Sequence, residues 1–444
     1  MSLLEKLDRR GNQARETNNS KETVSALPPD PYAAVKQKIH RDLINSMNKQ
    51  NLGTVDKDTM MSLIEEHVND EANGIPRIDR PKIVVEIYND VMGYGPIEEL
   101  LEDQRISEIM INGPDKIYIE SRGKLQLTGL KFRDEQHLMS VIDRIVSNVG
   151  RHVDEATPMA DARLPDGSRV NVIIPPLSLI GPVVTIRKFG KNPITAQQLI
   201  KFGSLNHNML AFLEACVRGK LNIVVSGGTG SGKTTLLNVL SSFIPSDERI
   251  ITIEDAAELQ LKQDHVITLE ARPANIEGKG AITIRSLVKN ALRMRPDRII
   301  VGEVRAEETL DMLQAMNTGH DGSLTTIHAN SPRDSIARIE TMVMMSGMDL
   351  PMKAIRNQIA SAIDIIIQQS RLRDGTRKVT SISEIVGMEG DIVSMQDIFV
   401  YETDGKLDAD GKFIGRFRAT GARPHCIEKI KSNGVNVNSD WFTD

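Results

Sequence analysis

The chain has 444 residues, which is enough for about three domains. Its 55 basic and 60 acidic residues leave a formal net charge of −5, so the composition gives no reason to expect direct nucleic-acid binding. The N-terminus carries charge where a signal peptide needs an apolar run, and no segment reaches about 18 uninterrupted apolar residues. We therefore expect a cytosolic protein that meets a membrane only peripherally or through a partner.

The residue pattern changes several times along the first half of the chain. Residues 1–30 are rich in Asn, Glu, Ser, Arg and Pro and have little to bury, so we expect a disordered tail. Residues 31–92 repeat apolar side chains at helical spacing and predict a small helical module. From 93 to 189 the apolar runs are short and separated by turn residues, which predicts an α+β domain, and 190–204 are expected to form a linker.

A complete phosphate-binding motif follows the apolar run 221–225, which predicts a buried strand. The spacing G-x-x-x-x-G-K-T lets successive backbone N–H groups converge on a phosphate. Lys233 is expected to reach the β- and γ-phosphates, and the Thr234 hydroxyl to ligate Mg²⁺. The predicted nucleotide-binding residues here are Gly227, Gly228, Thr229, Gly230, Ser231, Gly232, Lys233, Thr234 and Thr235.

Strand and helix patterns alternate after the motif, which favours a mainly parallel sheet covered on both faces. The fold class is therefore α/β for residues 205–444, with a C-terminal extension beyond 387. Residues 363–370 and 377–386 predict a hairpin around Asp374-Gly375. We interpret its basic flank as a solvated edge, and its members are Arg371, Arg373, Arg377 and Lys378.

Two acidic residues end predicted strands at the edge where a parallel sheet places its ligand. Glu254 follows the strand 249–253 and is a candidate to activate the attacking water, although a helix-capping role explains it equally well. Glu303 follows an apolar strand in the Walker B arrangement, in which a carboxylate holds Mg²⁺. Gly302 stands where many nucleotidases have aspartate, so a water-mediated contact of Glu303 with the metal is favoured.

Histidines lie at the two ends of another short strand, with His320 before it and His328 after it. Both cannot touch one phosphate unless the strand shifts or their roles differ. His328 lies at the C-terminal end and can sense the γ-phosphate, and the alternative is an imidazole bonded to backbone.

Arginines are dense in two places. Arg163, Arg169 and Arg187 belong to the predicted α+β domain, and their planar donors suit a γ-phosphate or its transition state. Arg187, at the end of an apolar strand, is the first candidate of the three to contact nucleotide, and an ion pair within the domain is the alternative. The second group surrounds the acidic strands and consists of Arg272, Arg285, Arg293, Arg295, Arg298 and Arg305.

Four blocks together resemble the secretion-ATPase superfamily. They are GGTGSGKTT, IEDAAELQL, RMRPDRIIVGEVR and MNTGHDGSLTTIHANSPRD, which correspond to the Walker A motif, aspartate box, Walker B motif and histidine box of that family. Within the superfamily the chain is most similar to the motor ATPases of tight-adherence (Tad) pili, the CpaF group, through GYGPIEELL, ISEIMINGPDKIYIE, ARLPDGSRVNVIIPPLS and TIRKF. One departure is Ala306, where glycine is expected.

The resemblance implies a RecA-like ATPase core and a homo-hexameric ring of two-lobed subunits on the cytoplasmic face of the inner membrane. ATP and Mg²⁺ would be the cofactors, and integral membrane pilus platform proteins the partners. It also implies that Lys233 and Thr234 act on phosphates and Mg²⁺, that Glu254 is the base, and that Glu303 lies at the metal. His328, and with it His320, would be sensors of the nucleotide.

Three other functions compete with a pilus motor. A GTPase needs Asn-Lys-x-Asp after the phosphate loop, and the similar run 48–51 is upstream and lacks the aspartate. A type IV secretion ATPase that translocates DNA or effector proteins shares the same motifs and is the main alternative. A ring that does not hydrolyse nucleotide is disfavoured because the expected acids and phosphate ligands are all present.

Overall fold

The computed structural model describes residues 31–50, 56–70, 75–121, 124–190, 193–272, 274, 279–409 and 411–443. The chain divides into two compact units, Met1–Lys191 and Asn192–Asp444, which are described separately below. The predicted disordered tail, residues 1–30, lies outside the described residues. Within the part that is described, every helix is too short or too polar to span a bilayer.

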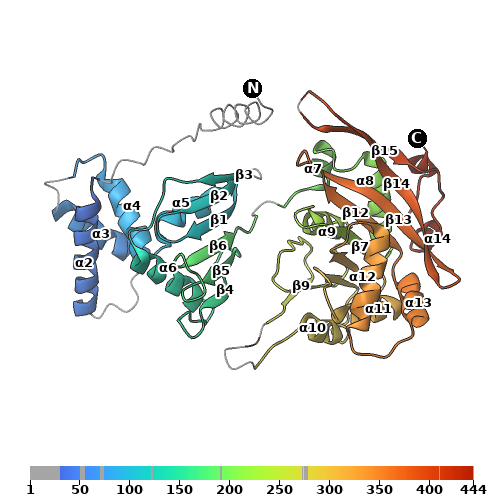
Figure 1. The fold of residues 1–444 in the computed structure, drawn as a ribbon, viewed down its shortest axis with the longest axis horizontal. Coiled ribbons are helices and arrows are strands. Elements are labelled where there is room, and N and C mark those ends of the chain that lie inside the picture. The colour runs from blue at the N-terminus through green and yellow to red at the C-terminus, as the bar shows by residue number, and fades with distance from the viewer. Residues whose placement is uncertain are drawn as a thin grey trace, which may run out of the picture. The chain divides into compact units, whose positions relative to one another are not determined.

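A helical module begins the described part of the first unit (Figure 1). It consists of α2 (Ala33–Gln50), α3 (Lys57–Asp70) and α4 (Arg80–Val91). The helical spacing of the apolar residues places them on facing sides, so that Ile39, Met60 and Ile83 become buried in one small core.

An antiparallel sheet with the order β3-β2-β1-β6-β5-β4 forms the rest of the first unit. Helix α6 (Glu135–Ser147) begins where the Asp134 carboxylate accepts a 2.7 Å hydrogen bond from the His137 N–H, and it buries Leu138 and Ile142 in the same core as the sheet. The other elements are η2 (Gly95–Ile97), α5 (Glu98–Glu102), β1 (Ile106–Asn112), β2 (Ile117–Ser121), β3 (Lys124–Leu127), β4 (Met159–Arg163), β5 (Arg169–Ile173) and β6 (Val183–Arg187).

A larger sheet with the order β15-β14-β13-β12-β7-β11-β10-β8-β9 organises the second unit. The strands from β12 to β9 run parallel, as predicted, and β13, β14 and β15 continue the sheet in antiparallel pairs. The bounds are β7 (Ile223–Gly227), β8 (Ile250–Glu254), β9 (Val266–Glu270), β10 (Arg298–Val301), β11 (Leu324–Ile327), β12 (Ile365–Arg371), β13 (Arg377–Glu389), β14 (Ile392–Leu407) and β15 (Phe413–Ala419).

Helices cover both faces of this sheet. Alternation along β7 sends Ile223 and Val225 into one apolar core and Val224 into the other, which is why the strand is apolar without interruption. One core includes residues of α7 (Ala196–Lys201), α8 (His207–Arg218), α9 (Lys233–Ser241), α14 (Ile427–Ser432) and η3 (Ser439–Phe442). The other includes residues of α10 (Ile284–Ala291), α11 (Glu308–Asn317), α12 (Pro332–Met344) and α13 (Met352–Ala362).

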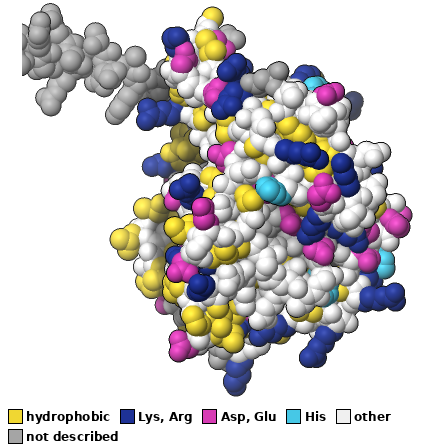
Figure 2. All heavy atoms as spheres, turned by 90° about the vertical axis from the view of Figure 1, so that its right-hand side faces the viewer, with side chains coloured by type: hydrophobic (Ala, Val, Ile, Leu, Met, Phe, Trp, Pro, Cys, Tyr) yellow, Lys and Arg dark blue, Asp and Glu magenta, His cyan; other side chains and the backbone are white. Residues whose placement is uncertain are grey.

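The C-terminal extension is an integral part of the second unit. Phe442 packs edge-on against Phe212 of α8 at 5.3 Å between ring centroids, and Phe399 of β14 completes the aromatic cluster. The sequence predicted only an extension beyond residue 387, without assigning its helices and strands. The face of the protein in Figure 2 carries basic and acidic side chains interspersed, in keeping with the small net charge.

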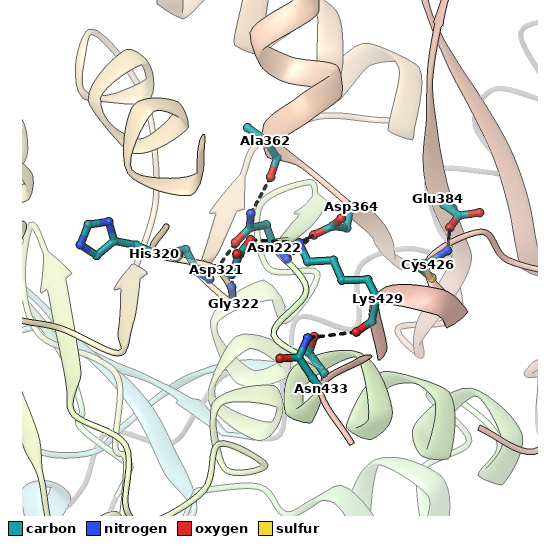
Figure 3. Close-up of polar contacts among 12 residues, drawn as sticks. Asn222, His320, Asp321, Gly322, Ala362, Asp364, Glu384, Cys426, Lys429 and Asn433 are labelled. Carbon is teal, nitrogen blue, oxygen red and sulfur yellow. Dashed lines mark hydrogen bonds and ion pairs between the residues drawn. The ribbon is translucent and has the colours of Figure 1, made fainter. Parts of the chain in front are cut away.

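A polar network around the buried Asn222 ties together the amino ends of three parallel strands (Figure 3). Asn222, just before β7, accepts a 2.9 Å hydrogen bond from Gly322 N, just before β11. Lys429 of α14 forms ion pairs of 3.0 Å with Asp321 and 2.9 Å with Asp364, which precedes β12. Helix α14 therefore anchors the edge of the sheet that lies opposite the phosphate loop.

Candidate nucleotide-binding site

The loop between β7 and α9 has a backbone that only glycine accommodates at two points. Gly232 has φ +96°, in the left-handed region, and ends the loop directly before α9. A Cβ on Gly227 would lie 2.2 Å from the Gln369 carbonyl oxygen of the neighbouring strand β12. The turn therefore requires Gly232, and the close approach of β12 requires Gly227.

The side chain of Lys233 packs against this loop. Only 8% of the residue is exposed, and its Nζ donates hydrogen bonds of 2.9 Å to Gly227 O and 3.0 Å to Gly228 O. Burial lowers the pKa of the Lys233 ammonium, and the nearby Glu303 carboxylate opposes this shift. The Ser231 hydroxyl is also buried, and it has no hydrogen-bond partner among the described residues. An ammonium and an unsatisfied hydroxyl in one loop fit a phosphate ligand.

The Lys233 ammonium belongs to a polar cluster, whose other residues lie at the carboxyl ends of neighbouring strands. His328 follows β11, and its Nε2 lies 3.2 Å from Lys233 Nζ and 3.3 Å from Glu303 Oε1. Burial, and next the Lys233 charge, lower the pKa of His328, and the Glu303 carboxylate opposes this shift. Because the same Nε2 faces both groups, it accepts from Lys233 in one tautomer and donates to Glu303 Oε1 in the other. Arg305 holds the other Glu303 oxygen at 2.6 Å and pairs with Asp255 at 3.3 Å.

Glu254 occupies a different environment from Glu303. It ends β8 with only 4% exposure, and its Oε2 accepts backbone hydrogen bonds of 2.8 Å from Glu258 N and 3.2 Å from Leu259 N. A Cβ on Gly302 would lie 2.7 Å from Glu254 Cγ. Glycine therefore replaces the usual Walker B aspartate to make room for Glu254. Two backbone N–H groups therefore hold the Glu254 carboxylate, and the carboxylate in turn anchors residues 258–259.

The two histidines of the histidine box are not brought together. His320 precedes β11 beside the network of Asp321 and Lys429, and its ring points away from that network (Figure 3). His328 lies at the opposite end of β11 with Lys233. The structure therefore does not place His320, which was predicted to bind nucleotide, at the phosphate loop of its own chain.

The three predicted arginines of the first unit lie in register. Arg163 of β4 pairs with Arg169 of β5, and Arg169 pairs with Arg187 of β6. Directly paired residues of an antiparallel sheet share a face, so three guanidinium groups line up across neighbouring strands. Glu108 of β1 is the next residue in the row, 3.9 Å from Arg187 Nε. A row of like charges is unfavourable unless acidic partners such as Glu108 or a bound anion offset it.

One contact of the phosphate loop contradicts the interpretation of the basic hairpin flank as purely solvated. Arg377, the first residue of β13, donates a 2.9 Å hydrogen bond from Nε to Gly230 O. The pairing of β12 with β7, which sets Gln369 beside Gly227, carries the hairpin to the loop. The sequence contained a signal for this contact, because a parallel strand that pairs directly with β7 ends near the phosphate loop. Only the order of the strands shows that β12 is this strand.

A parallel sheet with a phosphate loop after β7, acids at the carboxyl ends of β8 and β10 and a histidine after β11 defines a RecA-like P-loop NTPase fold. Residues 90–417 match the family model described as "Type II/IV secretion system protein". The chain therefore belongs to the type II/IV secretion system ATPase family.

Similar proteins support this assignment to the family. A putative conjugal transfer protein of Mycobacterium tuberculosis is 34% identical over 330 residues, which are 73% of this chain and 92% of that protein. The type IV secretion system protein VirB11 of Brucella abortus is 31% identical over 65% of this chain and 87% of its own. The pilus retraction motor PilT, solved with bound ADP, shares the fold with a TM-score of 0.51 and 20% identity over 76% of this chain and 86% of its own.

Proposed function

We propose that this protein binds ATP with Mg²⁺ and hydrolyses ATP to drive a membrane-associated secretion or pilus machine. The observation that carries the proposal is the contact chain from Lys233 through His328 to Glu303, which joins the phosphate loop to the Walker B acid. These residues come from three separate strand ends, and their convergence supports a site built for a triphosphate.

The residues of the site have distinct proposed roles. Loop amides and Lys233 hold the phosphates, and the half-buried Thr234 hydroxyl, in the first turn of α9, and the Glu303 carboxylate would hold Mg²⁺. The metal, when bound, neutralises charge on the phosphates. His328 would sense the γ-phosphate through Lys233, and Glu254 is the proposed base. His320 is proposed as a sensor only if β11 shifts or a neighbouring subunit supplies the nucleotide.

The machine that we propose is a Tad-type type IV pilus. In this proposal a homo-hexamer sits at the cytoplasmic face of the inner membrane and moves pilus platform proteins, without binding nucleic acid directly. The resemblance of the motifs before the linker to the CpaF group supports it. A type IV secretion ATPase that translocates DNA or effectors is the second candidate, and the VirB11 and conjugal transfer relatives favour it.

Copurification from native membranes distinguishes between the two proposed machines, the pilus and the secretion system. We expect integral pilus platform proteins to copurify with the tagged full chain. If the contact between the two proteins transmits movement, the amount of copurified platform protein changes with the bound nucleotide. A Lys233→Ala chain, purified in parallel, controls for nucleotide dependence. Recovery of conjugation or effector-secretion components without pilus platform proteins would instead establish the second candidate.

The arginine row of the first unit predicts a contribution between subunits. Arg187→Ala is expected to lower turnover by on the order of 10³, because a guanidinium that neutralises the transition state is removed. If the arginine acts on a neighbour, mixing Arg187→Ala subunits with Lys233→Ala subunits restores activity. An Arg187→Ala pocket can then borrow the arginine of a Lys233→Ala neighbour. Phosphate release from the reassembled mixtures is the measurement.

Two results would contradict the trans role of Arg187. Unchanged turnover in Arg187→Ala would leave the residue as the ion-pair partner of Glu108. Absence of recovery in every mixture would indicate action in cis, provided that one inactive subunit does not stop a whole ring. Mixing the unsubstituted protein with Lys233→Ala measures that poisoning. Arg163→Ala and Arg169→Ala, tested in the same way, show which member of the row is used.

A further inference from the structure

We infer that the hairpin β12–β13 completes the nucleotide site of its own subunit through two arginines. In this inference Arg371 binds the nucleotide at the end that lies away from Glu303, and Arg377 positions the phosphate loop. The inference rests on the proposed nucleotide binding and adds to it a binding residue and a positioning residue that lie outside the four sequence motifs.

Arg377 makes direct contact with the apex of the loop. Its Nε donates to Gly230 O at 2.9 Å, and a Cβ on Gly232 would lie 3.2 Å from Arg377 Cδ. Gly230 has φ +68° and Gly232 φ +96°, so the loop has little conformational preference of its own at these points. A guanidinium bonded to the carbonyl between them holds the loop in the shape that presents its amides.

Arg371 lies beside the same apex. Its Nη1 would be 3.8 Å from a Cβ on Gly230, and it pairs directly with Arg377 across the hairpin. Among the described residues, no hydrogen bond or ion pair involves the Arg371 guanidinium. Two cations placed directly opposite each other destabilise a strand pair, so this arrangement is explained if an anionic ligand lies between them and the loop.

A buried hydrogen-bond acceptor on the same strand as Arg371 also supports a ligand at this place. Gln369 of β12, two residues before Arg371, is only 2% exposed. Its Nε2 lies 3.2 Å from the position of a Cβ on Gly232. Its Oε1 is buried and has no hydrogen-bond partner in the part of the chain that the structure describes. An unsatisfied buried acceptor against the loop is costly unless a ligand or its water supplies a donor.

The order of the strands decides which part of the nucleotide this hairpin meets. Strands β11 and β10, which carry His328 and Glu303, lie on one side of β7, and β12 lies on the other. The γ-phosphate belongs with Lys233, His328 and Glu303 on the first side. The opposite end, with the α-phosphate and the nucleoside, therefore extends toward Arg371. ATP and ADP share this end.

The test is the affinity of the full chain for ADP, measured by isothermal titration, together with ATPase kinetics. Arg371→Ala is expected to weaken ADP binding and to raise the KM for ATP by the same factor, about tenfold for one lost charge-assisted contact, with kcat retained. Arg373→Ala is the matched control, because Arg373 is an exposed arginine of the same hairpin turn. It is expected to bind like the unsubstituted protein.

Arg377 is tested by comparing two replacements. Arg377→Ala is expected to raise KM with kcat nearly unchanged, and Arg377→Lys to recover part of the loss, because an ammonium can still donate to Gly230 O. Loss of folding alone would lower the thermal midpoint and would not be rescued by lysine. Equal ADP affinity in Arg371→Ala and the unsubstituted protein would overturn this inference only. Absence of ADP and ATP binding by the unsubstituted protein would overturn the proposed function as well.

Discussion

Replacing Lys233 with alanine is expected to abolish ATP hydrolysis. Only 8% of Lys233 is exposed, and its ammonium lies between the loop carbonyls and His328, which contacts Glu303. Its loss removes a preorganised charge from the phosphates and is expected to lower kcat by at least about 10²–10³-fold. The measurement is release of inorganic phosphate with Mg²⁺ and saturating ATP.

A matched lysine controls for a general loss of charge. Lys262 is an exposed residue of the same unit, and Lys262→Ala is expected to hydrolyse ATP at the unsubstituted rate. Thermal unfolding of both variants verifies that the fold survives. Undiminished hydrolysis by Lys233→Ala would contradict the assignment of this loop as the phosphate site.

Replacing the two acids one at a time is expected to produce different defects. Glu254→Gln should bind ATP nearly normally and fail to cleave it, because phosphate and metal contacts remain while the proton acceptor is lost. Glu303→Gln should instead shift the Mg²⁺ concentration that gives half-maximal turnover, since the carboxylate facing Lys233 and His328 is the proposed metal ligand. Nucleotide binding, single-turnover cleavage and a Mg²⁺ titration measure the three effects.

The contacts of Glu254 offer a competing explanation that the experiment has to separate. Glutamine is neutral, so Glu254→Gln turns the charge-assisted hydrogen bonds from the N–H groups of Glu258 and Leu259 into weaker neutral ones and loosens the anchoring of that segment. A lowered thermal midpoint together with weaker ATP binding would indicate this structural effect. Equal turnover in Glu254→Gln and the unsubstituted protein would reassign the base, and Glu303, beside Lys233, becomes the candidate.

The α/β fold class, and the polar residues that lie at the ends of individual strands, were predictable from the sequence. The glycine spacing, the uninterrupted apolar run of β7 and the acids after β8 and β10 are local patterns, set by neighbours along the chain. Each pattern indicates its own strand or loop regardless of how the strands are ordered. The helical module and the hairpin β12–β13 were predictable for the same reason.

The partners of each residue were decided only by the tertiary structure. Lys233 and His328 are 95 positions apart, and Arg377 and Gly230 are 147 apart, so their contacts depend on the order β12-β7-β11-β10. His320 is far from the phosphate loop because it precedes β11, whereas the loop follows the neighbouring parallel strand β7. The pairing of β8 with β10 explains Gly302, since Glu254 occupies the space of a side chain there. Periodicity and motifs specify what each segment can form. The burial of both sheet faces selects the neighbours, because only the folded sheet brings strand ends from distant segments together.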